Sequence, residues 1–193
     1  MQERNNNNNL IPPHGGYRKL VSYQMAEIVY DATIKFCERF IDKRSRTFDQ
    51  MVQAARSGKQ NIAEGSMASG TSKKIELKLI GIARASLEEL LQDYEDFLRQ
   101  NNLKLWHKND ERAIKIRSLG KIRDKSYMTY MSYIENSSPE LAANTIICLI
   151  HQTNYLLDQL LRKLEEQFLK EGGFTERLYK HRKNFRDRDD EGK

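Results

Sequence analysis

The chain has 193 residues, of which 38% are hydrophobic and 31% charged, with a net charge of +6 and a mean hydropathy of −0.78. This balance is typical of a globular protein with one hydrophobic core and excludes an intrinsically disordered chain. No apolar stretch is long enough to cross a bilayer, and the polar start of the chain lacks the apolar core of a signal peptide. We therefore expect a cytoplasmic protein without a membrane partner.

The residue types that carry most enzyme and metal chemistry are few and scattered. Cys37 and Cys148 fall inside helical apolar patterns, which favours two buried small hydrophobic side chains over a disulfide or a nucleophile. The four histidines form no cluster with cysteine or acidic residues at the spacing of metal ligands. We expect no metal, no cofactor and no enzymatic activity.

The N-terminal part of the chain predicts a leader and two helices. Residues 1–16 are rich in Asn and then in Pro and Gly, and predict a disordered leader. Between Tyr17 and Phe40 the apolar residues recur at helical spacing, and they do so again from Phe48 to Ile62. The segment 65–70, which holds two glycines and two serines, is expected to end the second helix.

Two longer helical patterns follow. The third runs from Ile75 to Leu98, with Thr71 or Ser72 as its cap. The fourth starts with a cap serine and a proline at 138–139 and ends at two glycines, 172–173. Four apolar stripes bury one another best by antiparallel packing at a shallow crossing angle. The sequence therefore predicts an all-α fold, an antiparallel four-helix bundle over residues 17–171.

Two segments lie outside this pattern. An insert at 103–137, between the third and fourth helices, has weaker helical patterns around 113–119 and 127–134 and contains the only tryptophan. An extension at 172–193 is polar, with apolar residues spaced for one short amphipathic helix. Because two glycines detach this extension, we expect it to be a docking element and no part of the core.

Two motifs in the second and third helices are more specific than their periodicity. They are Asn61-Ile62-Ala63-Glu64-Gly65 and Ile82-Ala83-Arg84-Ala85-Ser86-Leu87-Glu88-Glu89-Leu90. Together they resemble the four-helix bundle family of large-subunit rRNA intervening-sequence proteins, which includes the accessory variability proteins of diversity-generating retroelements. The resemblance covers residues 17–171 and is strongest from Met51 to Phe97.

This resemblance implies an up-down-up-down bundle that assembles into a ring-like homopentamer without catalysis. Retroelement members of the family bind nucleic acid and a reverse transcriptase through basic surfaces, whereas the intervening-sequence members have no settled role. The 103–137 insert and the 172–193 extension depart from the short members. The chain resembles in this respect a longer variant with a C-terminal suffix, and the identity of its partner stays open.

The first motif has two interpretations. Asn61, Glu64 and Gly65 form either a binding constellation or a structural turn, and we favour the turn, with Gly65 as a positive-φ helix stop and the other two hydrogen-bonded near it. Gly58 lies inside the second helix, where glycine costs about 1 kcal/mol relative to alanine. A close helix crossing or a subunit contact would offset this cost, and a bend in the helix is the alternative.

The charge distribution supplies the main candidate site. From Lys43 to Arg84 there are nine basic residues against three acidic ones, whereas residues 85–101 hold one basic residue against five acidic ones. Clustered basic side chains bind nucleic acid by neutralising phosphates and releasing counterions, although a charge run is also compatible with an ordinary solvated surface. The predicted nucleic-acid-binding residues are Arg44, Arg46, Arg56, Lys59, Lys73, Lys74, Lys78 and Arg84.

Two functions are compatible with these features. The leading hypothesis is a non-enzymatic, oligomeric accessory protein that binds RNA or DNA through the backbone, in the service of a reverse transcriptase or on structured RNA. No base-reading motif is apparent, so we expect no sequence readout. The alternative is a protein-only adaptor that docks a partner protein through its charged faces and C-terminal extension.

Overall fold

The structure is a computed structural model, which describes residue 11 and residues 13–191, with side chains up to residue 187. The described residues contain helices and no strand, which confirms the predicted all-α class. The elements are a short 3-10 helix η2 (Tyr17–Lys19) and the α-helices α1 (Val21–Phe40), α2 (Arg46–Ala68), α3 (Lys73–Gln100), α4 (Glu111–Leu119), α5 (Tyr127–Ile134), α6 (Pro139–Glu171) and α7 (Phe174–Glu191).

Several helix ends are fixed by the residues that the sequence indicates. The Ile75 amide donates to Ser72 Oγ at 3.2 Å, so Ser72 caps α3. The Leu141 amide donates to Ser138 Oγ at 3.2 Å, with Pro139 as the first residue of α6. Gly172 ends α6 with a φ of +71°, a backbone conformation that favours glycine. These predicted caps are confirmed.

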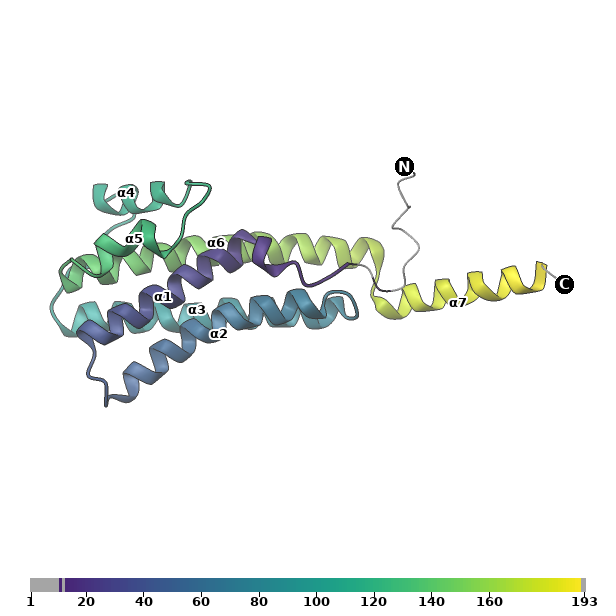
Figure 1. Cartoon of the computed structure of the whole chain (residues 1–193), viewed down its shortest axis with the longest axis horizontal. Coiled ribbons are helices and arrows are strands. Elements are labelled where there is room, and N and C mark those ends of the chain that lie inside the picture. Colours follow the sequence, from purple (N-terminus) through teal and green to yellow (C-terminus); the bar gives the residue numbers. More distant parts are fainter. Residues whose placement is uncertain (1–10, 12, 192–193) are drawn as a thin grey trace.

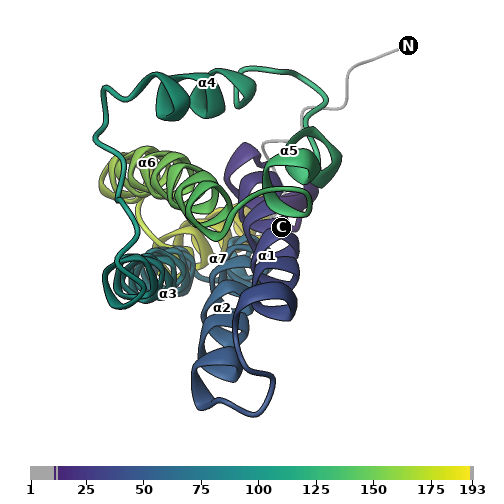
Figure 2. The ribbon, with the colours of Figure 1, turned by 90° about the vertical axis from the view of Figure 1, so that its left-hand side faces the viewer.

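Four long helices enclose the core. α1 packs against α2 and α6, and α3 packs against the same two helices, so that the four form a closed circuit of neighbours (Figure 2). α4 and α5 pack on α6, and α5 also contacts α1 (Figure 1). In the described part of the chain, no helix is both long and apolar enough to span a membrane.

Aromatic side chains link α1 and α3 across the core. The Phe36 ring of α1 lies 4.8 Å from the Tyr94 ring and 4.9 Å from the Phe97 ring of α3, both edge-on. The Tyr94 hydroxyl donates to Thr33 Oγ1 at 3.1 Å, so that its polar group is satisfied although the side chain is fully buried. Cys37 and Cys148 are buried free thiols, as predicted.

Glycines allow α2 and α3 to approach closely. A Cβ built on Gly58 would lie 2.7 Å from Leu87 Cδ2, which supports the close-crossing interpretation of this residue. The prediction for Gly65 is wrong. α2 continues through it to Ala68, and it is not among the positive-φ glycines; it faces Ile80, whose Cδ1 would lie 3.3 Å from an added Cβ. Both glycines therefore serve helix packing.

The insert is attached to α6 through its tryptophan. Trp106 is buried, its backbone amide donates to Asn144 Oδ1 at 2.8 Å, and its Nε1 donates to Glu140 Oε1 at 3.1 Å. The Arg112 guanidinium lies 4.3 Å from the centre of the Trp106 ring. Two short helices occur in this insert, α4 and α5, at the positions that the sequence predicts.

The segments that precede η2 and follow α6 both contact the region of the α2–α3 turn. Most of the predicted leader, 1–16, lies outside the described residues; near its end, the Gly15 amide donates to Ser66 O at 3.1 Å. The extension forms α7, the predicted amphipathic helix, which projects away from the other helices (Figure 1). Arg177 Nη2 donates to Gly70 O of the α2–α3 turn at 3.3 Å.

Candidate nucleic-acid interface

The predicted basic residues are adjacent in sequence but lie at two ends of the α2–α3 pair. Arg46 opens α2, and Lys73 and Lys74 open α3, after the turn that follows α2. A helix rises about 1.5 Å per residue, so the length of α2 separates these two groups by about 33 Å. The structure therefore does not bring all eight residues together on one surface.

Two of the eight are neutralised by carboxylates. Lys73 Nζ lies 2.8 Å from Glu76 Oε2, and the two side chains are only 17% and 11% exposed. Arg84 faces α6, with Nη1 at 2.6 Å from Glu88 Oε2 and Nε at 3.2 Å from Asp158 Oδ1. Burial lowers the pKa of Arg84, but the hydrogen bonds and charges of these carboxylates outweigh it and raise the pKa. Neither cation is available to a phosphate without breaking an ion pair.

The residues in the middle of α2 diverge. Lys59 is half-buried, with its ammonium 4.4 Å from the centre of the Tyr30 ring on α1, so it contributes to the contact between these helices. Arg56 is exposed. Because Lys59 faces a neighbouring helix and Arg56 faces solvent, these two residues do not form a pair that could clamp a phosphate backbone.

The start of α2 has mixed charge. Arg46 lines a shallow groove between α2 and α3, together with Asp49 and Glu89. Arg44 is exposed in the preceding connection, where its backbone amide donates to Asp42 Oδ1 at 2.9 Å. At this end, Arg46 lies beside Asp49 of its own sequence block and Glu89 of the following acidic block. These carboxylates weaken the attraction of the start of α2 for a polyanion.

The Asn61, Glu64 and Gly65 motif is not a turn. Asn61 Nδ2 donates to Ser57 O at 2.9 Å and to Ser57 Oγ at 3.1 Å, and the Ser57 and Ser86 hydroxyls are 2.9 Å apart. Glu64 is exposed, and within the described residues its side chain makes no hydrogen bond. The expected hydrogen bonds near the following turn are therefore wrong. Asn61 belongs to a polar seam between α2 and α3.

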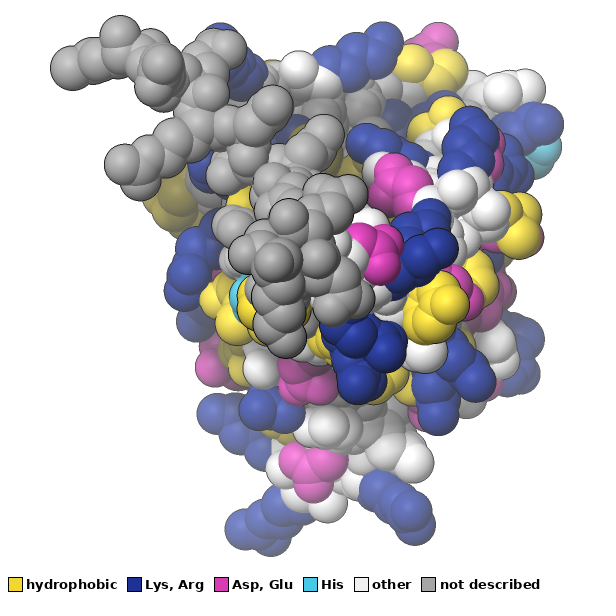
Figure 3. Space-filling model, turned by 90° about the vertical axis from the view of Figure 1, so that its right-hand side faces the viewer, with side chains coloured by type: hydrophobic (Ala, Val, Ile, Leu, Met, Phe, Trp, Pro, Cys, Tyr) yellow, Lys and Arg dark blue, Asp and Glu magenta, His cyan; other side chains and the backbone are white. Residues whose placement is uncertain are grey.

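Exposed cations without a carboxylate partner occur at the end of the molecule where α7 begins. Lys74 and Lys78 are one turn apart on α3, both exposed, and neither is ion-paired within the described residues. α7 begins at the same end, since Arg177 reaches the α2–α3 turn. Figure 3 views this end directly and shows Lys and Arg side chains spread over it.

Sequence reasoning missed the contribution of α7. Residues 174–187 hold five Lys or Arg against two acidic residues, a signal that was readable from composition. The spacing of Phe174, Leu178 and Phe185 indicated instead a helix with an apolar face, and the prediction was based on that face. We define the basic end as Lys74 and Lys78 with the exposed cations of α7, which are Lys180, Arg182, Lys183 and Arg186.

The described residues contain no group of three or more His, Cys, Asp or Glu side chains arranged to hold a metal ion. Burial raises the pKa of the Cys37 thiol to about 12 and that of the Cys148 thiol to about 11. Both therefore stay protonated at neutral pH, the form that is a poor nucleophile.

Comparison with known proteins adds no assignment, because no family model, curated protein or solved structure matches the chain.

Proposed function

We propose that the protein is a non-enzymatic accessory protein that binds nucleic acid through the phosphate backbone at its basic end. The observation that carries this proposal is that α7, with four exposed cations, begins beside the α2–α3 turn, the same turn that leads into α3 with its two exposed lysines. Backbone N–H groups at the start of a helix also favour anions. The resemblance of residues 51–97 to proteins of retroelements points the same way.

We further propose a bundle topology for the chain and a ring of five chains. α1, α2, α3 and α6 would form an up-down-up-down antiparallel bundle, with α4 and α5 as its insert, and five chains would form a ring. The closed circuit of helix neighbours supports the bundle. Exposed apolar side chains on the outer face of α3, Ile75 at 49% and Ile82 at 39%, support a subunit contact. Light scattering should give about five times 22.7 kDa, and a monomer at micromolar concentration would contradict the assembly.

The experiment that tests binding is a salt titration with fluorescent mixed-sequence RNA and duplex DNA, followed by anisotropy. If four cations contact phosphates, affinity should fall about 50- to 150-fold between about 50 and 200 mM salt. Changing the base sequence should leave the affinity nearly unchanged, because contacts to the phosphate backbone carry no sequence information. Absence of binding at low salt would overturn the proposed function.

A second function rests on a separate observation. Tyr179 and Phe185 on the projecting α7 are 65% and 68% exposed, which is unusual for aromatic side chains without a partner. This favours an adaptor that docks a partner protein, with a reverse transcriptase as the expected candidate, through α7. Binding of a purified reverse transcriptase encoded beside this chain, lost on truncation after Glu171 and retained at high salt, is the outcome that distinguishes it.

A further inference from the structure

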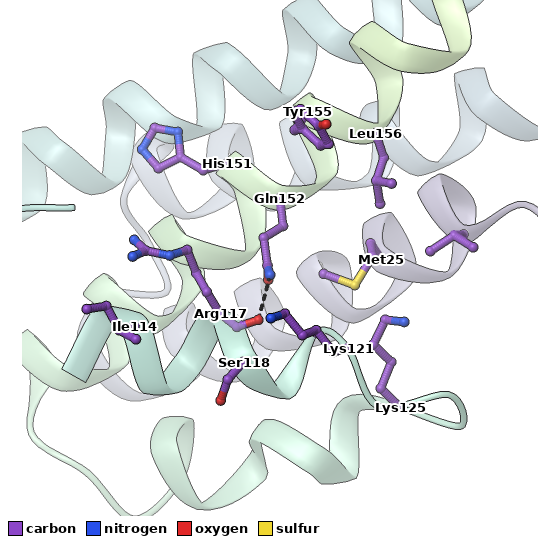
Figure 4. A pocket seen from close by; sticks show the side chains of 12 residues that line it. Met25, Ile114, Arg117, Ser118, Lys121, Lys125, His151, Gln152, Tyr155 and Leu156 are labelled. Carbon is purple, nitrogen blue, oxygen red and sulfur yellow. Dashed lines mark hydrogen bonds between the residues drawn. The ribbon is translucent and has the colours of Figure 1, made fainter. Parts of the chain in front are cut away.

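A pocket of about 550 Å³ lies where the end of α4 and the loop after it face α6 and the start of α1 (Figure 4). Its apolar part is formed by Val21 and Met25 of α1 with Tyr155 and Leu156 of α6. Tyr155 is 63% exposed and Val21 46%, so apolar surface is open to solvent here. The volume falls in the range of small-molecule sites, about 300–1,000 Å³.

The charged lining of this pocket has one sign. Arg117, Lys121 and Lys125 line it together with His151, and its lining residues include no acid. Within the described residues none of these three cations is paired with a carboxylate; Lys125 Nζ donates to a backbone carbonyl, Ile122 O, at 3.3 Å. The pocket therefore presents uncompensated positive charge beside apolar surface.

A neighbouring groove differs from the pocket in the charge of its lining residues. That groove shares Lys125 with the pocket, and its other charged lining residues are two cations and three acids, namely Arg18, Arg123, Glu27, Asp31 and Asp124. Lys125 therefore has acidic neighbours on the groove side, whereas the pocket's own lining contains cations and no acid.

Two neutral polar side chains of the pocket, Ser118 and Gln152, already make hydrogen bonds within the protein. The Ser118 hydroxyl donates to Lys115 O at 2.7 Å, and Gln152 Nε2 donates to Arg117 O at 2.9 Å (Figure 4). The Gln152 amide packs on Gly120, where an added Cβ would lie 2.6 Å from Nε2, and its unpartnered Oε1 is enclosed by protein. Apart from the exposed Tyr155 hydroxyl and His151 ring, what the pocket offers a ligand is apolar contact and positive charge. A nucleobase would leave most of its hydrogen-bonding groups unsatisfied there.

We propose that this pocket binds a small organic carboxylate with an apolar, acyl-like body. The body would lie on Met25, Leu156 and Tyr155, and the carboxylate would face Lys121 and Lys125, which Figure 4 shows on the loop side of the pocket. Apolar burial supplies affinity, and the unpaired cations select the anion. This site is separate from the basic end and does not depend on nucleic-acid binding.

The probe is decanoate, titrated into the full chain by isothermal calorimetry below its micelle concentration. We expect one site per chain with a Kd of about 10–100 µM. Decyltrimethylammonium has a linear alkyl chain one carbon longer and the opposite charge, and should bind at least about tenfold more weakly. Adenosine monophosphate is an anion with a polar body, and tighter binding of this compound than of decanoate would overturn the proposal in favour of a nucleotide site.

Two variants locate the site. Lys121→Glu/Lys125→Glu should weaken decanoate about tenfold or more, and Ser118→Trp should do so by filling the pocket without a change of charge. Lys104→Glu/Lys108→Glu carries the same charge change outside the lining residues and should stay within about twofold of the unaltered chain. Equal loss in both charge variants, equal binding of decanoate and decyltrimethylammonium, or no binding of decanoate would overturn the proposal.

Discussion

The close crossing of α2 and α3 predicts opposite effects for two glycine substitutions. Gly58 and Gly81 both lie inside helices, where alanine is intrinsically favoured by up to about 1 kcal/mol. A Cβ at Gly58 would lie 2.7 Å from Leu87 Cδ2 and 2.8 Å from Leu87 Cγ, and Leu87 is fully buried. Overpacking of this kind costs about 1–3 kcal/mol, so Gly58→Ala should destabilise the protein by about 1–2 kcal/mol.

Gly81→Ala is the matched control, because an added Cβ there would have nothing within 4 Å. We expect it to stabilise the protein by about 0.5–1 kcal/mol. Guanidinium unfolding followed by far-UV circular dichroism measures both changes. In Gly58→Ala/Leu87→Ala the new methyl group would fill part of the space that Leu87 leaves. The double variant should therefore be more stable than the sum of the single changes by about 1 kcal/mol. The reasoning is refuted if both alanines are equally stabilising.

Three further predictions concern α7, the insert and the thiols. Truncation after Glu171 should lower the free energy of unfolding by less than about 1 kcal/mol, measured by the same method, because α7 projects from the other helices. The hydrogen bond from Trp106 holds the pKa of the Glu140 carboxyl below its ordinary value. The ionised carboxylate therefore stabilises the fold fully above about pH 4.3, and this stabilisation is lost as the pH falls through the lower pKa of the folded state. Trp106→Phe should therefore destabilise the protein at neutral pH, and pH-dependent unfolding should show the difference from the unaltered chain narrowing below about pH 4. Cys37 and Cys148 should react with a thiol-specific reagent only at the rate of unfolding, and fast modification of the folded chain would contradict their burial.

Helix ends were predictable where one residue determines them locally. Ser72, Ser138 and Gly172 act through their own side chain or backbone, and their effect is therefore visible in sequence. Gly65 was not predictable in this way. A glycine- and serine-rich segment begins at Gly65, and such a segment is typical of the end of a helix. In the structure, however, the missing side chain of Gly65 allows close contact with Ile80 of α3. This tertiary requirement overrides the local preference.

The basic character of the candidate site was predictable from the sequence, but its position on the molecule was predictable only in part. The excess of Lys and Arg is visible in composition, but antiparallel pairing carries Arg46 and Lys74 to opposite ends of the same two helices. Arg84 meets Asp158 although 74 residues separate them in the chain, and no local pattern indicates that pairing. Only the three-dimensional arrangement brings α7 to the same end as Lys74 and shifts the candidate interface there.

The central claim is tested most directly by comparing two charge reversals, one at each end of the α2–α3 pair. Lys74→Glu/Lys78→Glu and Arg44→Glu/Arg46→Glu change the net charge equally, and both place acidic residues near a helix N-terminus, where they favour folding.

Binding of the fluorescent RNA should weaken at least about tenfold in the lysine variant, with the salt slope reduced by about 1.4–1.8, and should stay within about threefold in the arginine variant. Equal weakening in the two variants would contradict the account, because any positive charge on the chain would then serve as well as the basic end.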